Sequence, residues 1–396
     1  MMRKRLPWSV RFILGSCLLA VTGVGCSQAQ PVPPPPAGQG LRFEKRVLDT
    51  AFRAEGVTVV DFDVDGDRDV LAGAVAYVAP EWSRRELIAQ QPLDPATQFS
   101  EAFAVFSGDF GPSGRQDLIV VAFPLGPARW LQLQPPGTQW ATPSVADPAS
   151  TESPLFLRLP GSARPSLVFT RGRDLVAASF DGGTVATRVL ATAPGDIPGH
   201  GLGYGDINGD GRNDFLTIIG VFLASDGAAY RFVPADLGPD CAQMHVFDVD
   251  EDGRADVVSS SAHAKGVFWH RQQAPVAGED RLVFTRSIID DSFSQSHALE
   301  LADLTGDGRP ELITGKRRWA HGPQGDVDPD APAVLYAFEA RRASDGTVTW
   351  VRHELDPEQD SGVGTQFEVT DVDGDGLKDI VTANKEGVFL FRRLSE

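Results

Sequence analysis

The chain has 396 residues, of which 42% are hydrophobic and 23% charged, as is usual for a soluble globular protein. Its formal net charge of -18 argues against nucleic acid as a partner, because phosphate backbones are bound by basic surfaces. The 41 glycines and 29 prolines favour short strands joined by many turns over long helices.

Residues 1–26 have the pattern of an export signal. Residues 3–5 are basic, and a mostly apolar run follows from Trp8 to Val24. That run is short and interrupted by glycine, so it does not predict a membrane span. Cys26 follows small residues and resembles the cleavage site of bacterial lipoproteins. The resemblance implies that Cys26 is acylated and that the lipid anchors the protein on the outer side of the cytoplasmic membrane. Cleavage without lipid and an uncleaved anchor are the alternatives.

Residues 27–40 form a proline-rich linker. The four consecutive prolines at 33–36 predict an extended, polyproline-type spacer that would hold the next domain off the membrane, in the periplasm or at the cell surface. Apart from Cys26, Cys241 is the only cysteine after the signal, so no internal disulfide is expected. Bound cations are therefore expected to stabilise the exported domain.

Short apolar runs recur from residue 41 onward, with no helical period. Four such runs per unit of about 50 residues predict an all-β fold: a seven-bladed β-propeller with four-stranded blades over residues 41–396. The segment 41–48 looks like the fourth strand of a blade, and the final repeat stops after its third strand, 387–391. We therefore expect the amino-terminal strand to pair with the last blade and close the ring.

Seven polar loops begin at residues 61, 109, 158, 206, 248, 303 and 371, with spacings of 48, 49, 48, 42, 55 and 68 residues. Five of them, here called the acidic loops, have acidic or polar side chains at positions 1, 3, 5 and 9 and glycine at position 6. Such a loop can fold oxygen ligands, including the carbonyl of position 7, around one calcium ion. Most of these ligands are missing from the loops at 109 and 158, where ordinary turns are expected. The candidate calcium-binding residues are Asp61, Asp63, Asp65, Asp67, Asp69, Asp206, Asn208, Asp210, Arg212, Asp214, Asp248, Asp250, Asp252, Arg254, Asp256, Asp303, Thr305, Asp307, Arg309, Glu311, Asp371, Asp373, Asp375, Leu377 and Asp379.

The repeats resemble the FG-GAP/VCBS type of integrin α-subunit propellers and of many exported bacterial proteins. The resemblance covers residues 41–396 and depends on the frame of Asp371–Asp379 and its four relatives. It implies that each loop joins the innermost strand of a blade to the second strand and binds calcium. The repeats at 109 and 158 depart from the family's loop, which puts metal binding there in doubt.

A second group of candidates lies at the opposite ends of the same strands. If the acidic loops join strands one and two, the start of strand one and the end of strand two lie on the other face. Ionisable residues gather there, including four of the seven histidines of the chain. The candidate ligand-binding residues are Glu55, Glu152, His200, His263, His297, Lys316, Arg317, His321, Asn384 and Lys385.

Two chemistries fit this group. Glu55 and Glu152 with several histidines can hold a transition metal, because imidazole and carboxylate are good zinc ligands. Lys316, Arg317 and Lys385 can instead bind a carboxylate or sulfate group. A wet channel whose polar side chains pair with one another is the third interpretation.

The favoured function is a monomeric, calcium-binding propeller outside the cytoplasm that binds a saccharide, an anion or a protein through this face. One alternative is a metal-assisted sugar dehydratase or lyase, because some enzymes that act on oxidised sugars are built on a similar propeller; a histidine or Glu152 would then remove a proton. Another is a structural scaffold in the cell envelope. We favour a binding module over an enzyme. The sequence has no Gly-x-Ser-x-Gly elbow, phosphate-binding loop or Cys-x-x-Cys pair, so serine-hydrolase, nucleotide and thiol chemistries have no support.

Overall fold

The structure is a computed structural model that describes residues 33, 36–38, 40–87, 91–110, 116–122, 126–132, 144–146, 151–181, 184–226, 229–238, 241–278 and 280–395. The predicted export signal with Cys26, most of the linker, and residues 111–115 of the loop at 109 lie outside these ranges. Residues Val32–Glu396 are one compact unit. In the described ranges this unit is built of β-strands without any α-helix, which confirms the predicted all-β class. Nowhere in those ranges is there a helix with the length and apolar character needed to cross a bilayer.

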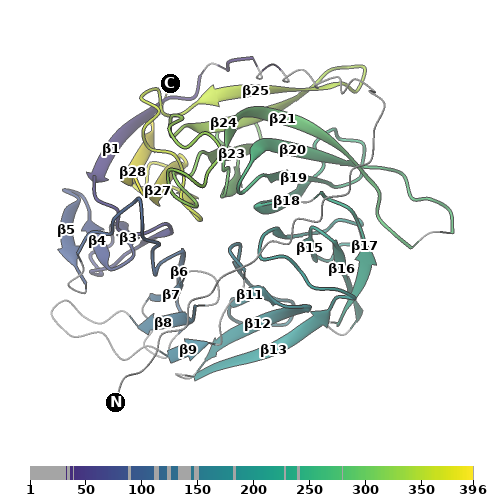
Figure 1. Ribbon diagram of the computed structural model, residues 1–396, viewed down its shortest axis with the longest axis horizontal. Helices are drawn as coiled ribbons and strands as arrows, with labels where there is room; N and C mark the ends of the chain where they lie inside the picture. Colours follow the sequence, from purple (N-terminus) through teal and green to yellow (C-terminus); the bar gives the residue numbers. More distant parts are fainter. Residues whose placement is uncertain are drawn as a thin grey trace, which may run out of the picture. The chain divides into compact units, whose positions relative to one another are not determined.

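The strands in the described ranges form five four-stranded sheets and one eight-stranded sheet. Figure 1 shows the sheets following one another around a common axis like the blades of a propeller, with β13, β17 and β25 on the outside and β6 and β18 nearer the middle. The first two sheets contain β2 (Val57–Val60), β3 (Asp69–Ala72), β4 (Val75–Val78) and β5 (Ser83–Glu86), then β6 (Ala104–Gly108), β7 (Asp117–Val121), β8 (Ala128–Gln132) and β9 (Ser144–Ala146). The third contains β10 (Leu155–Leu157), β11 (Ser166–Arg171), β12 (Asp174–Asp181) and β13 (Thr184–Thr192).

The eight-stranded sheet consists of two consecutive groups of four antiparallel strands. They are joined by the parallel pairing of their innermost strands, in which Leu202 lies opposite Gln243 and Tyr204 opposite His245. This sheet contains β14 (Leu202–Gly205), β15 (Asp214–Thr217), β16 (Gly220–Ser225), β17 (Ala229–Pro234), β18 (Gln243–Phe247), β19 (Asp256–Ser260), β20 (Lys265–Gln272) and β21 (Phe284–Ser294). The sheet after it contains β22 (Leu299–Ala302), β23 (Glu311–Gly315), β24 (Leu335–Arg342) and β25 (Val348–Glu354).

The last sheet combines the two ends of the described chain. It contains β26 (Glu368–Thr370), β27 (Asp379–Asn384) and β28 (Gly387–Arg393), and β1 (Phe43–Asp49) is its outer strand. β1 runs antiparallel to β28, with Phe43 opposite Arg393 and Val47 opposite Phe389. Without β1, the outer edge of β28 would present unpaired backbone groups to solvent.

A lysine on β1 adds a polar connection that the sequence did not suggest. Lys45 Nζ lies 3.1 Å from Asp356 Oδ1 and 3.0 Å from Glu358 Oε2, and it also contacts Asp360. Burial alone would lower the pKa of Lys45, but the hydrogen bonds that its ammonium group donates to the three carboxylates raise it above its usual value. The ammonium group therefore supplies the positive charge at this acidic cluster and ties β1 to the loop between β25 and β26.

Buried second strands explain why the sequence shows continuous apolar runs rather than strict alternation. Every residue of β3, β7, β19 and β23 is buried, because neighbouring sheets cover both faces of these strands. The outer strands are different: all four residues of β5 are exposed. One cluster of buried side chains, for example, joins Ile119 and Trp130 of the second sheet to Phe169 and Phe180 of the third.

Candidate functional site

The acidic loops join the first strand of a sheet to its second strand, as the resemblance implied: the loop 206–214 connects β14 to β15, and 371–379 connects β26 to β27. The first aspartate closes the turn. In the loop at 371, Asp371 Oδ1 accepts a hydrogen bond from Gly374 N at 2.7 Å, and Asp371 Oδ2 accepts one from Gly376 N at 3.0 Å. Asp206 makes the same contacts with Gly209 and Gly211.

In three of the loops, carboxylates at positions 1, 3 and 9 lie close enough to share one ion. The oxygens of each trio lie within 4.8 Å of one another; the trios are Asp61, Asp63 and Asp69, then Asp248, Asp250 and Asp256, and finally Asp371, Asp373 and Asp379. Position 3 in the other two loops is the neutral Asn208 or Thr305, which leaves fewer carboxylates there. The three trios are the best cation ligands among the loops.

The carboxylate at position 9 also has a structural role that the sequence did not reveal. Asp379 Oδ2 accepts a hydrogen bond from Val372 N at 2.8 Å, and its Oδ1 accepts one from Arg393 N on the third strand at 2.8 Å. In the weakened loop at 109, Asp117 keeps this position and accepts the indole N–H of Trp130 at 3.1 Å. The carboxylate at position 9 therefore holds the loop at 371 against its own sheet, and at Asp117 it ties the second strand to the third.

Negative charge accumulates at the acidic loops. Burial, together with the charge of neighbouring aspartates, raises the pKa of Asp214, Asp256 and Asp379 to about 6. Arginines compensate part of this charge: Arg271 Nε lies 2.6 Å from Asp250 Oδ2. Asp250 Oδ1, by contrast, is buried and accepts no hydrogen bond from any described residue. An all-oxygen set with such an oxygen fits a hard divalent cation.

Position 4 of the loops has a backbone constraint that the sequence did not reveal, although glycine occupies this position in three of them. Its backbone is left-handed throughout, with φ of +73° at Gly209 and +80° at Gly374. Val64 and Glu251 occupy the same position with φ of 64° and 54°. A β-branched residue is strained in this region.

Replacing Val64 with glycine is therefore expected to stabilise the protein by about 0.5–1 kcal/mol, because the relieved strain exceeds the added chain entropy of the unfolded state. Gly374→Val is expected to destabilise it by about 1–2 kcal/mol. A Cβ at Gly374 would meet no atom within 4 Å, so this change tests backbone conformation without a steric clash. Thermal melts in calcium would measure both effects. If the two variants melt alike, the strain argument is wrong.

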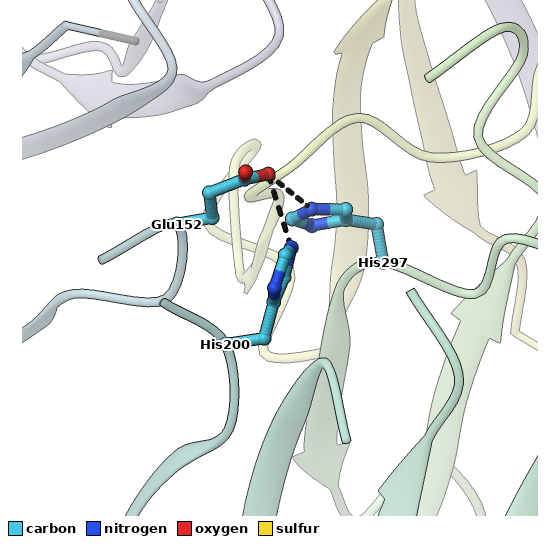
Figure 2. Close-up of side chains that lie close together, drawn as sticks. All are labelled: Glu152, His200 and His297. Atoms are coloured by element: carbon cyan, nitrogen blue, oxygen red, sulfur yellow. Dashed lines mark hydrogen bonds and ion pairs between the residues drawn. The ribbon is translucent and has the colours of Figure 1, made fainter. Parts of the chain in front are cut away.

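At the opposite ends of the strands, the structure brings together five of the predicted residues: Glu152, His200, His263, His297 and His321, here called the histidine mouth. Glu152 precedes β10, His200 precedes β14 and His297 precedes β22. Figure 2 shows these three side chains converging from separate segments of the chain. Glu152 Oε2 lies 3.2 Å from His200 Nε2 and 2.9 Å from His297 Nε2.

Backbone hydrogen bonds fix this arrangement. Glu152 N donates to Gly199 O at 2.7 Å, which holds Glu152 beside His200. The other two rings come from the ends of second strands: His263 follows β19, and His321 follows β23. The ring centroid of His263 lies 4.8 Å from that of His200 and 4.6 Å from that of His321. Two imidazoles thus contact the Glu152 carboxylate, and two more lie next to them.

Burial and charge set the protonation of the central group. Burial lowers the pKa of His297 to about 3, which keeps its imidazole neutral near neutral pH. Burial would raise the pKa of Glu152, but hydrogen bonds from His200 and His297 lower it well below its usual range. An ionised carboxylate therefore faces at least one neutral imidazole at physiological pH.

The basic residues predicted for the same face are buried and paired rather than presented to a ligand. Arg317 Nη2 lies 2.6 Å from Glu55 Oε1, and both side chains are almost fully buried. Glu55 was also predicted to bind a metal together with Glu152. The structure places Glu152 with His200 and His297, and Glu55 is not among these clustered ligands. Lys316 Nζ donates to Ser294 Oγ at 2.8 Å, and Lys385 Nζ donates to Trp319 O at 2.8 Å.

Asn384 is a structural residue in the same region. Its Nδ2 donates to Ser361 O, and its Oδ1 accepts a hydrogen bond from Glu386 N at 2.7 Å. Burial lowers the pKa of both Lys316 and Lys385. Of the ten candidates on this face, His321 has the most open environment, with 55% of its side chain exposed. The histidine mouth is therefore the part of this face that a ligand can reach.

The sequence reasoning missed two carboxylates inside the central channel. The innermost strands line a cavity of about 400 Å³ that contains Glu300 and Glu368. Burial and, to a smaller extent, the charge of Glu368 raise the pKa of Glu300 to about 8. Glu368 Oε2 accepts a hydrogen bond from Val59 N at 2.8 Å and so bridges two innermost strands. One sequence signal could have revealed the first of these carboxylates: Glu300 is a charged residue between Leu299 and Leu301 in an otherwise apolar strand.

Comparison with known proteins agrees with this architecture. Residues 222–314 match the family model of the FG-GAP-like repeat. This match and the propeller arrangement of the sheets support the FG-GAP repeat family. A search of curated proteins found no match.

Two solved structures are similar in part. One is the "Crystal structure of BBS1N in complex with ARL6DN, soaked with lead", with 10% identity, coverage of 90% of this chain and 97% of that chain, and a TM-score of 0.49. The other is that of the V. cholerae biofilm matrix protein Bap1, with 16% identity, coverage of 76% of this chain and 39% of that chain, and a TM-score of 0.31.

Proposed function

We propose that the chain is an exported, lipid-anchored and calcium-binding β-propeller that binds an extracellular ligand through the histidine mouth. In this proposal the propeller has seven blades. The five four-stranded sheets are five of them, and the eight-stranded sheet is two blades that pair at their innermost strands. The pairing of β1 with β28 supports a ring closed by the amino-terminal strand.

The acidic loops support the calcium component. Their ligand atoms are oxygens, and three loops gather three carboxylates each. The buried and unpartnered Oδ1 of Asp250 is a position that a bound cation would satisfy. When bound there, calcium would neutralise the charge that the loops concentrate and hold strand one to strand two.

One observation carries the binding function: the side chains of the histidine mouth, from three sheets, converge in one place. Polar groups that converge at the end of a repeated scaffold are typical of a ligand site. Saccharide, anionic and protein ligands all fit the proposal. The paired state of Arg317 and Glu55 weakens the dehydratase or lyase alternative, in which Arg317 would stabilise an enolate.

A printed array of neutral, uronic-acid and sulfated oligosaccharides tests the saccharide form of this proposal. The mature protein is expected to bind one class, and His321→Ala is expected to weaken that binding about tenfold, because an exposed contact to the ligand is lost. Thr187→Ala, on the exposed outer strand β13, is the matched control and should bind like the native protein. Absence of binding to every class, or equal binding by His321→Ala, would overturn the saccharide proposal.

A further inference from the structure

We propose that Glu152, His200 and His297 form a binding site for one divalent transition metal of the zinc class. The inference goes beyond the proposed function, because it requires neither a saccharide ligand nor calcium in the acidic loops. It depends on three side chains whose ligand atoms all lie within 4.8 Å of one another.

The geometry of these atoms fits a shared ion. Zinc binds imidazole nitrogen and carboxylate oxygen at about 2.0–2.2 Å in tetrahedral geometry, which separates neighbouring ligand atoms by about 3.3 Å. Glu152 Oε2 lies 3.2 Å from His200 Nε2 and 2.9 Å from His297 Nε2. A small expansion of the group would therefore admit the ion without rearrangement of the backbone.

The surroundings favour metal binding over a simple hydrogen-bonded pair. The side chain of His297 is fully buried, and those of His200 and Glu152 are 21% and 16% exposed. Each residue precedes an innermost strand of a different blade, so the three ligands are held by the scaffold rather than by a mobile loop. The group is also half enclosed, which leaves one side open for a fourth ligand.

Two further imidazoles, those of His263 and His321, lie next to these three ligands. The ring centroid of His263 is 4.8 Å from that of His200 and 6.3 Å from that of His297. Three protein ligands with an open fourth position are the arrangement of a metal site that can exchange water for another molecule. An incoming ligand would therefore bind the metal at this fourth coordination position.

The donor set separates this site from the acidic loops. Imidazole nitrogen selects zinc, nickel or copper over calcium, whereas the loops offer oxygen ligands that suit calcium. The two classes of site lie at opposite ends of the innermost strands. Saturating calcium can therefore fill the loops and leave the Glu152 site available to zinc.

The test is titration of the metal-stripped mature protein with zinc chloride in excess calcium, followed by calorimetry and elemental analysis. The wild type is expected to bind zinc in a one-to-one ratio, and His297→Gln to weaken binding by at least about 100-fold, since even second-shell changes at zinc sites cost about 10–100-fold. His353→Gln is the matched control, because His353 Nε2 also pairs with a carboxylate, Glu339 Oε2 at 3.0 Å, but without a second imidazole.

Cobalt binding to the wild type supplies a second measurement that does not depend on how a variant folds. Intense visible absorption bands of four-coordinate cobalt are expected, and equimolar zinc should remove them. The inference is overturned if the wild type binds no stoichiometric zinc in calcium, if His297→Gln binds zinc like the wild type, or if cobalt gives no such bands. Zinc binding without saccharide binding would refute the saccharide function and leave the metal site standing.

Discussion

Chelation of calcium is expected to lower the melting temperature of the mature protein by about 15 °C. At a free calcium concentration 100 times its Kd, one bound ion stabilises the folded state by about 2.7 kcal/mol. Three occupied loops would therefore contribute about 8 kcal/mol. At about 2 °C per kcal/mol for a domain of this size, the shift is large enough to measure by differential scanning calorimetry. Added calcium should restore the native melting temperature.

Asp250→Asn distinguishes calcium binding from a purely structural role of the loops. Asp250 is 2% exposed, and its Oδ1 has no partner in the described part of the chain. The variant is expected to bind one calcium ion fewer and to melt several degrees lower. Glu81→Gln, an exposed acidic residue outside the loops, is the control. An unchanged melting temperature after chelation, with no calcium in the native protein, would contradict the calcium proposal.

Deletion of residues 41–48 is expected to prevent the mature protein from folding to a soluble monomer. Five of the six residue pairs between β1 and β28, from Phe43 to Val47, lie within the deletion, and loss of these backbone contacts would cost about 5 kcal/mol at about 1 kcal/mol each. The deletion also removes Lys45 from the buried carboxylate of Asp356, which would leave that charge without its cation. Such a loss is comparable with the total stability of a typical domain.

A shorter truncation provides the control for this experiment. Removal of the chain through Gly40 abolishes the hydrogen bonds of Pro36 and Gly38 with Arg352, at 2.8 and 2.6 Å, but leaves β1 in place. It is expected to cost about 1–2 kcal/mol and to leave the protein soluble. Size-exclusion chromatography and thermal melts would compare the two proteins. Equal behaviour would show that β1 does not complete the last sheet in solution.

Much of the fold could be predicted because each repeat carries its own local signals. The segment 387–391 was predicted as the third strand of the final repeat and lies in β28, and the strand predicted at 41–48 lies in the last sheet as β1. The glycine at position 6 and the apolar run after position 9 mark a turn and a buried strand within one short stretch. Such signals need no knowledge of distant residues.

Side-chain partners on the opposite face could be predicted only in part. Counting from the loops placed His200 and His297 at the same end of their strands, and the structure brings both to Glu152. The same counting gave no warning that Arg317 would pair with Glu55, which lies 262 residues away. A register argument fixes the face on which a residue lies. The partner depends on how neighbouring blades pack, and one blade's sequence does not contain that information.

The double role of position 9 makes blade construction separable from ion binding. Asp117 ties β7 to Trp130 of β8 in a repeat that has lost most of its other acidic side chains. A repetitive protein of this kind can lose the proposed ion ligands in one copy and still form the strands of that copy. The same independence offers a route for engineering: grafting Asp61–Asp69 into the repeat at 109 would install a new cation receptor on a strand framework that already accepts its final carboxylate.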